Sequence, residues 1–154
     1  MFDFNENPFI SIIFKISRKT FTTLFSQLEK LKIHPGQFPI LLLLLKQDNI
    51  SQIEIANKVC VKPSTIAVIL RKMEKNNLIE KMTDKHDRRV FYIKLTENGK
   101  EIANKTFRII DELEKKITLA LSFEEKENLI NYLYKIIEKL DELNIKNNKV
   151  KSCQ

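Results

Sequence analysis

Apolar residues recur at three- and four-residue spacings over residues 8–32, which predicts an amphipathic helix at the start of the chain. The repeat consists of Phe14, Phe21, Leu24, Phe25, Leu28 and Leu31. Pro35 and Gly36 interrupt it, and the more apolar run from Gly36 to Lys46 predicts a second, more buried helix. The polar residues 47–49 supply the next turn.

A short helix, a turn and a longer helix are predicted between residues 51 and 75. Ser51 and Glu54 have the spacing of a capping box, in which each side chain accepts a hydrogen bond from the other residue's backbone amide, so we expect a helix over 52–58. After a turn at 59–62, Pro63 suits the first position of a helix, where an amide hydrogen would have no partner. This helix should run to Lys75, with an apolar face of Ile66, Ile69, Leu70 and Met73.

Two strands joined by a polar hairpin tip are predicted next, over residues 78–81 and 90–95. The second strand alternates, with Val90, Tyr92 and Lys94 on one face and Phe91, Ile93 and Leu95 on the other. The charged residues 83–89 form the expected tip.

The C-terminal third predicts two long helices. Thr96 should cap a helix from Glu97 to about Leu121, and Ser122 with Glu125 forms a second capping box that opens the last helix. The expected core face of the former is Ile102, Phe107, Ile110, Leu113 and Ile117, and the apolar seam of the latter is Leu129, Ile130, Leu133, Ile136, Ile137, Leu140 and Leu143. Because this seam is too broad for a lone helix on so small a domain, we expect it to pack, with the first helix, against a second copy of the chain.

These elements predict a mostly α fold with a minor β part, namely a winged helix-turn-helix with long N- and C-terminal dimerisation helices. The 154 residues fit one domain, and 2 glycines and 4 prolines are too few for a many-stranded sheet. We expect residues 1–33 and 97–145 to form the dimerisation helices and 34–96 the winged helix-turn-helix. Residues 146–154 should be a flexible tail.

The basic charge is concentrated in the middle of the chain. The net charge is +7, and residues 51–100 hold 11 Lys and Arg against 6 Asp and Glu, whereas residues 101–154 hold 10 of each. A basic segment that is also patterned as folded structure predicts a polyanion partner. The longest apolar run, 38–45, is far below the roughly 20 residues that cross a bilayer, and Asp3 and Glu6 are unlike a secretory signal. We therefore expect a cytoplasmic protein with no membrane partner.

The helix after the turn is the candidate recognition helix, because in this motif it enters the major groove. Pro63, Ser64 and Thr65 lie at its N-terminal end, where free amides and the helix dipole favour phosphate oxygens. The alternative for Ser64 and Thr65 is simple helix capping.

Three further residues of this helix have side chains suited to base edges. Arg71 fits bidentate contact with guanine, while Ala67 or Val68 fits contact with a thymine methyl group. The alternative for Arg71 is an ion pair with Glu74, three residues later.

Four segments then resemble the multiple-antibiotic-resistance regulator (MarR) family of bacterial transcription factors. They are residues 55–66, which include Lys62-Pro63-Ser64-Thr65, and 73–80, 87–89 and 95–99. The order of elements matches over nearly the whole chain. The resemblance implies an obligate homodimer that binds pseudo-palindromic double-stranded operators and is released or retuned by a small ligand or by oxidation. We expect a sequence-specific repressor.

The resemblance also implies a role for the hairpin tip. In the family's wing motif, carried here by Asp87 and Arg89, the arginine enters the minor groove and the aspartate orients it. The alternative for Arg88 and Arg89 is a solvated tip paired with Asp87 or Asp84. The residues expected to contact DNA are therefore Lys62, Pro63, Ser64, Thr65, Ala67, Val68, Arg71, Lys72, Lys85, Asp87, Arg88 and Arg89.

A small aromatic or amphipathic effector is a further possibility, since Phe14, Phe21, Phe25 and Phe38 are placed to line a cavity. Core or dimer packing explains these aromatic residues equally well.

Cys60 is interpreted as a packing residue of the turn rather than a redox centre. The two cysteines lie far apart in sequence, so neither a disulfide nor a zinc site is expected. We expect no cofactor, and no pattern of catalytic residues or Gly-rich phosphate loop suggests an enzyme. The alternatives to the main interpretation are a winged-helix protein-interaction module and a regulator that senses oxidation through Cys60.

Overall fold

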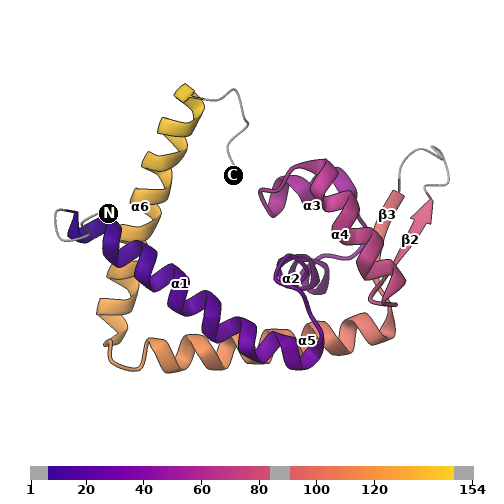
Figure 1. Ribbon diagram of the computed structural model, residues 1–154, viewed down its shortest axis with the longest axis horizontal. Coiled ribbons are helices and arrows are strands. Elements are labelled where there is room, and N and C mark those ends of the chain that lie inside the picture. The colour runs from indigo at the N-terminus through magenta and orange to yellow at the C-terminus, as the bar shows by residue number, and fades with distance from the viewer. Residues whose placement is uncertain (1–6, 84–90, 148–154) are drawn as a thin grey trace, which may run out of the picture.

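The structure, a computed structural model, describes residues 7–83 and 91–147 (Figure 1). In chain order the elements are α1 (Pro8–Leu28), the 3-10 turn η1 (Glu29–Leu31), α2 (Phe38–Lys46), β1 (Ile50–Ser51), α3 (Gln52–Lys58), α4 (Pro63–Lys75), β2 (Ile79–Thr83), β3 (Phe91–Leu95), α5 (Glu97–Ile117) and α6 (Phe123–Asn147). Helices predominate and one small sheet is present, so the predicted mostly α fold is confirmed.

The two helices of the predicted helix-turn-helix begin and end at the predicted residues because their ends are chemically marked. At the start of α3, the Glu54 amide donates to Ser51 Oγ at 3.2 Å and the Ser51 amide donates to Glu54 Oε2 at 2.8 Å. The hydrogen bond from the Ser51 backbone amide to the Glu54 carboxylate, followed by one from the Ser51 side chain, holds the pKa of Glu54 below its usual value. Pro63 occupies the first turn of α4.

The sheet has three antiparallel strands in the order β1-β3-β2. Ile79 pairs with Leu95 and Thr83 pairs with Phe91, which sets the register of the β2–β3 hairpin. The sequence pattern missed β1, because two residues are too short to show alternation. Its Ile50 pairs with Ile93, and both side chains are buried.

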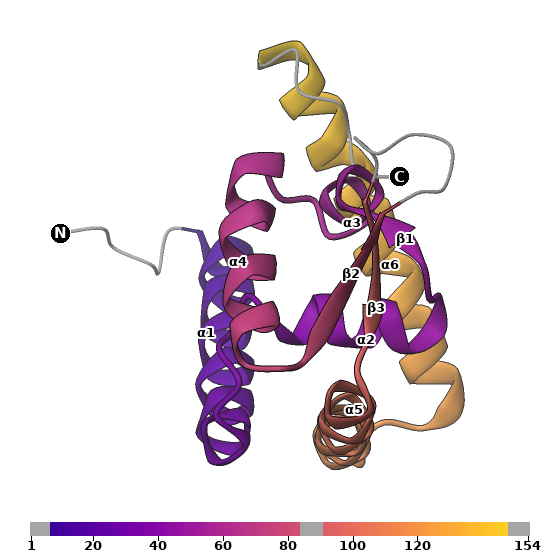
Figure 2. The ribbon, with the colours of Figure 1, turned by 90° about the vertical axis from the view of Figure 1, so that its right-hand side faces the viewer.

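The hydrophobic core lies around α2, whose Ile40, Leu41 and Leu44 are buried. This helix packs against α5 on one side and against β3 on another. Figure 2, in which α5 is seen nearly end-on, shows α2 between α5 and the β2–β3 hairpin. The core therefore joins the sheet and the helix-turn-helix to α5.

The buried stripe of α5 differs from the predicted one. Leu113 is buried and Ile102 and Ile110 are half-buried, but Phe107 and Ile117 are about half exposed. Instead the small residues Gly99, Ala103 and Thr106 are buried. The prediction was wrong because it counted only large apolar residues, whereas closely packed elements meet through small ones.

α5 also ends at Ile117 rather than near Leu121. Leu119 is 85% exposed, so a further helical turn would bury no apolar surface here. The Leu121 amide donates to the Thr118 carbonyl at 3.0 Å, which closes a turn. The predicted capping box of Ser122 and Glu125 then opens α6.

α6 rises from the far end of α5, away from α2, α3 and α4 (Figure 1). None of its residues 123–143 is buried, and the predicted seam, from Leu129 to Leu143, is exposed or only half-buried. α1 buries Leu24 and Leu28 near its C-terminus, but its N-terminal part leaves large apolar side chains exposed: Phe9, Ile10, Ile12, Phe14 and Ile16. The helix continues to Asn147, so residues 146 and 147 do not belong to the predicted tail.

Candidate nucleic-acid interface

α4 has one buried and one exposed face. Ile66, Leu70 and Met73 are fully buried against the rest of the chain. The other face exposes the residues that the sequence assigned to DNA: Lys62, Pro63, Ser64, Thr65, Val68, Arg71 and Lys72 are exposed, and Ala67 is half-buried. The structure thus brings eight of the proposed contact residues together on one accessible surface of α4 and its N-cap.

The turn before α4 fixes how this surface is presented. The Val61 amide donates to the Ala56 carbonyl at 3.1 Å, and Gln52 Nε2 donates to the Pro63 carbonyl at 3.5 Å. These bonds link α3 to the start of α4. Gln52 was not singled out in the sequence, because its partner is a backbone atom eleven residues away.

Ser64 and Thr65 do not cap α4. The N-cap is Lys62, whose carbonyl accepts from the Thr65 amide at 2.9 Å and from the Ile66 amide at 3.1 Å. No side-chain cap is present, and within the described residues the hydroxyls of Ser64 and Thr65 have no hydrogen-bond partner. The capping alternative is therefore wrong, and both hydroxyls remain available to an external acceptor or donor.

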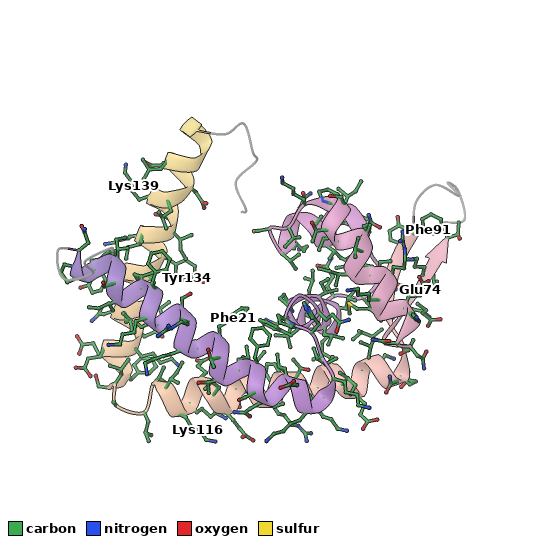
Figure 3. The ribbon with its side chains drawn as sticks, viewed as in Figure 1. Phe21, Glu74, Phe91, Lys116, Tyr134 and Lys139 are labelled. Atoms are coloured by element: carbon green, nitrogen blue, oxygen red, sulfur yellow. The ribbon has the colours of Figure 1, made fainter. Side chains whose placement is uncertain are left out.

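The ion-pair alternative for Arg71 is also wrong. Glu74 Oε2 lies 2.5 Å from Lys81 Nζ on β2 instead, and Figure 3 shows Glu74 at the end of α4 near this strand. Among residues 7–83 and 91–147, no acidic side chain forms an ion pair with the cations of α4 and its N-cap: Lys62, Arg71, Lys72 and Lys75. Lys75 was absent from the predicted contacts. Lys58 on α3 differs from these cations, because its charge acts on the Glu54 carboxylate and helps to lower the pKa of Glu54.

By contrast, the lysines of α5 are largely neutralised by neighbours on the same helix. Lys100 pairs with Glu97 and Lys105 with Glu101. Lys115 Nζ lies 2.6 Å from Asp111 Oδ2, and this pair raises the pKa of Lys115. Within residues 51–100, Lys81, Lys94 and Lys100 are also paired, so the uncompensated cations of the described residues in this range lie on α4 and its N-cap.

The base of the wing is joined to α5 by a compact hydrogen-bond network. Thr96 Oγ1 donates to the Asn77 carbonyl at 2.7 Å and accepts from the Gly99 amide at 2.9 Å. Asn98 Nδ2 donates to the same Asn77 carbonyl at 3.1 Å. Asn77 has a φ of 54°, in the left-handed region that asparagine tolerates. This network gives a structural reason for two segments of the resemblance, 73–80 and 95–99.

Gly99 is required by the closeness of this junction. A Cβ atom built at Gly99 would lie 1.8 Å from the carbonyl oxygen of Leu78. No heavier residue fits without moving the start of β2 away from α5.

The wing tip lies outside the described residues. Lys85, Asp87, Arg88 and Arg89, and with them the alternative of a solvated tip paired to Asp84 or Asp87, fall in the segment 84–90. The described flanks are Thr83 and Phe91, which pair at the end of the β2–β3 ladder. The proposed minor-groove role of Arg89 stays a prediction.

The four aromatic residues proposed for an effector are only partly brought together. The rings of Phe21 and Phe25 meet edge-on with centroids 4.0 Å apart, and Figure 3 shows Phe21 projecting from α1 on the side of α2. Phe38 packs against the core, whereas Phe14 is exposed. An effector site at these residues stays a prediction.

Cys60 was interpreted from the sequence as a packing residue of the turn, but the structure leaves it exposed. Its side chain is exposed and its φ is 57°, a backbone conformation more typical of glycine or asparagine. The residue is disulfide-bonded, so the expectation of no disulfide is wrong in this structure.

The described part of the chain contains no group of three or more His, Cys, Asp or Glu side chains arranged to hold a metal ion. None of its helices combines the length and apolar character needed to cross a membrane.

Comparison with known proteins finds similarity to one family over the same region. The MarR family model matches residues 33–91. The HTH-type transcriptional regulator SarZ of Staphylococcus haemolyticus (strain JCSC1435) is 24% identical over 132 residues, which cover 86% of this chain and 88% of SarZ. The HTH-type transcriptional repressor MdtR of Bacillus subtilis (strain 168) is 33% identical over 76 residues, or 49% of each chain.

Solved structures resemble nearly the whole chain. The MepR–DNA complex of S. aureus has a TM-score of 0.80 at 28% identity and covers 85% of this chain and 97% of MepR. A mutant MarR from E. coli complexed with operator DNA has a TM-score of 0.78 at 23% identity, covering 88% and 99%. The latter likeness concerns the fold, which includes both the winged part and the long helices.

Proposed function

We propose that the chain is a member of the MarR family, whose model matches residues 33–91, and that it is a dimeric transcription regulator that binds double-stranded DNA in a sequence-specific manner. The relatives named as a regulator and as a repressor, and the structures solved as DNA complexes, support this function. Since these relatives are regulators of transcription, the proposed function is not enzymatic. The proposed location of the protein is the cytoplasm, where a bacterial chromosome lies.

One observation carries the proposal most directly: the exposed face of α4 combines free hydroxyls with uncompensated cations. Ser64 and Thr65 offer hydroxyls, and Arg71 and Lys72 offer charges that no acidic side chain of the described chain neutralises. Half or more of protein–DNA hydrogen bonds go to phosphate and sugar, and direct sequence reading occurs at base edges. This face of α4 supplies groups for both.

The partner in the proposed assembly is a second copy of the chain. The exposed apolar side chains of α1 and the seam of α6 make up a large surface that this chain alone leaves in contact with water. A twofold dimer through these helices would place two α4 helices roughly 34 Å apart, one turn of the duplex. This geometry predicts a pseudo-palindromic operator.

The direct test is selection of duplexes from a random pool by the full chain at near-physiological salt. We expect an enriched sequence with twofold symmetry and half-sites separated by about 10 base pairs. Failure to enrich any sequence, or enrichment of a single asymmetric site by a monomer, would contradict the proposal.

A salt titration separates this function from that of a winged-helix protein-interaction module. Binding to the selected duplex should weaken by roughly a power of ten or more between 50 and 200 mM salt, because lysines and arginines release counterions from the phosphates they neutralise. A nearly flat salt dependence would favour the protein-interaction module.

The wing is tested by Arg89→Ala in the same assay. If Arg89 enters the minor groove, affinity for the selected duplex should fall by about tenfold or more while the melting temperature stays unchanged. The matched control is Lys100→Ala, which removes a cation that Glu97 neutralises at 2.8 Å. Equal affinity of wild type and Arg89→Ala would remove the wing from the interface.

Repression and release complete the proposal. An effector that prefers a dimer whose α4 helices are wrongly spaced would lower operator affinity by its preference between the two states. The aromatic pair Phe21 and Phe25 on α1 is the proposed contact for an aromatic or amphipathic effector. Binding of such compounds to Phe21→Ala at the same affinity as to wild type would exclude this contact.

A further inference from the structure

Val68 is an apolar side chain at the centre of the exposed face of α4, and 50% of it is accessible to solvent. It follows Ser64 by one helical turn and precedes Lys72 by one, so the three share a face opposite the buried Ile66 and Leu70. A β-branched residue in mid-helix is a poorer helix former than alanine. No packing within this face explains its presence, because the neighbouring exposed positions on α4 are polar or charged.

The surroundings of Val68 define what it would meet on a duplex. Lys62 lies before it and Arg71 after it, and neither has an acidic partner in the described part of the chain. Cations of this kind contact phosphates and fix the register of a helix in the groove. The residue between them then faces the base edges rather than the backbone.

An isopropyl group has no hydrogen-bond donor or acceptor, so it cannot pair with the polar edges of adenine, guanine or cytosine. The one apolar group that the bases present in the major groove is the C5 methyl of thymine. Burial of that methyl group against Val68 is favourable for both surfaces.

We propose that Val68 is a specificity-determining residue that reads a thymine methyl group in each half of the operator. This inference rests on the proposed function and adds the chemistry of one base position to it. The adjacent Ala67 is half-buried and reaches less far from the helix axis, which makes Val68 the main contact.

The size of the effect follows from the group that is buried. One methyl-sized group removed from water corresponds to about fourfold in affinity, and two symmetric half-sites to about 15-fold. The effect is therefore modest but measurable in a direct binding titration.

The test replaces thymidine by deoxyuridine in the duplex that the full chain selects from a random pool. Deoxyuridine keeps Watson–Crick pairing and removes only the methyl group. One pair of symmetry-related positions is changed at a time, and the dissociation constants of wild type and Val68→Ala are measured on each duplex. The Val68→Ala variant should keep its melting temperature, because the side chain is exposed and alanine favours helix.

The expected result is a loss of roughly 15-fold for wild type at one pair of positions, and little or no further loss at that pair for Val68→Ala. Ile53→Ala is the matched control: Ile53 is an equally apolar residue, 65% exposed on α3, and its removal should leave the deoxyuridine effect intact.

The failures can be told apart. If no duplex is enriched, the proposed function fails and this inference fails with it. If a duplex is enriched but no deoxyuridine pair weakens binding, or if wild type and Val68→Ala lose equally at the sensitive pair, sequence-specific binding stands and the role of Val68 is overturned.

Discussion

The winged part of this chain (α2, α3, α4 and the sheet) and the long-helix part (α1, α5 and α6) differ in how much of their apolar surface is buried within the chain. In the winged part, α2, α3, α4 and the sheet bury their apolar faces within the chain: Ile40, Ile55, Ile66 and Ile93 are fully buried. In the long-helix part, α6 buries none of residues 123–143 and α1 buries two side chains near its end. The apolar faces of the winged part are thus covered within the chain, with α5 and the end of α1 contributing to the same core, whereas α6 and the start of α1 leave an apolar surface exposed.

The charges of α4 and α5 differ in the opposite sense. The cations of α4 have no acidic partner among the described residues, whereas Lys100, Lys105 and Lys115 on α5 are paired along the helix. Unpaired charge on a complete unit favours a charged ligand, and paired charge beside an exposed apolar seam favours a protein partner. The comparison thus assigns DNA to one part and self-association to the other.

The largest expected effect comes from placing a charge in the α6 seam with Leu133→Glu. Burying a carboxylate costs about 3 kcal/mol per copy, and twofold symmetry doubles this, so the dimer dissociation constant should rise about 10⁴-fold. Sedimentation velocity over a range of protein concentrations measures the change. The control Glu138→Gln lies on α6 outside the seam and should leave the dimer intact.

Leu133→Glu also tests whether the winged part is complete. Its monomer should keep the helical circular dichroism of a folded chain, because Leu133 supports no part of the core around α2. A variant that stays dimeric would contradict the assignment of the seam, and one that unfolds altogether would contradict the independence of the two parts.

The junction between the parts gives the next largest effect. Gly99→Ala forces a Cβ to within 1.8 Å of the Leu78 carbonyl oxygen, and we expect it to lower the free energy of unfolding by about 3 kcal/mol. In an ordinary exposed helix the same change would instead stabilise by about 1 kcal/mol. The melting temperature and the affinity for the selected duplex should both fall, since the base of the wing is anchored at this point.

Gly36→Ala is the matched control for this prediction. Its new Cβ would lie 3.1 Å from Ile69 Cδ1, the end of a flexible side chain that moves at small cost. We expect a change below about 1 kcal/mol. Equal losses for Gly36→Ala and Gly99→Ala would mean that glycine itself, rather than the close approach of Leu78, is needed at position 99.

The sequence predicted the winged part more accurately than the long helices, for a physical reason. The starts of α3 and α4 are marked by signals contained in a few neighbouring residues, the Ser51–Glu54 box and Pro63, so these starts matched the structure. The end of α5 has no such signal, and whether residues 118–121 continue the helix depends on what lies beside them. The prediction extended the helix because Leu119 and Leu121 are apolar.

The candidate site shows the same division. Periodicity alone placed Ser64, Val68 and Arg71 on the exposed face of α4, and the structure confirms that arrangement. The pairing of Glu74 with Lys81, and the link from Thr96 to Asn77, join residues seven and nineteen positions apart. Contacts across a turn or between elements depend on tertiary geometry, so the pattern of a single sequence does not predict them.

A smaller effect is expected from removing one unpaired cation. Arg71→Ala should weaken binding to the selected duplex by about 10- to 100-fold and leave the melting temperature unchanged. The loss should concentrate on one base pair if Arg71 contacts guanine, and it should be the same for all sequences if Arg71 contacts only phosphate.

Lys115→Ala provides the contrast with a paired cation. Because Lys115 is neutralised by Asp111 on α5, its removal should change duplex affinity by less than about twofold. If Lys115→Ala weakens binding as much as Arg71→Ala, the distinction between paired and unpaired charge would not explain where DNA binds.

The smallest expected effect comes from replacing the glutamate of either capping box by glutamine, and it depends on pH. The pKa of Glu54 and that of Glu125 are both lowered, chiefly by the backbone amides of Ser51 and Ser122. A glutamate whose pKa is lowered in the folded state stabilises that state. The stabilisation is complete when the pH is above the unfolded-state pKa of roughly 4.3, and it is lost as the pH falls through the folded-state pKa. A glutamine at either position keeps the cap geometry but does not titrate.

Glu54→Gln should therefore melt slightly below wild type near pH 7, by no more than about 2 °C for an exposed cap, and the difference should vanish on acidification. If the two parts unfold separately, Glu54→Gln alters only the transition that is independent of protein concentration, which reports the winged part. Glu125→Gln should alter only the concentration-dependent transition, because α6 packs against the second copy in the proposed dimer. A single transition that both substitutions shift equally would show that dimerisation and the winged part form one cooperative unit, and the contrast between them would then be one of surface rather than of stability.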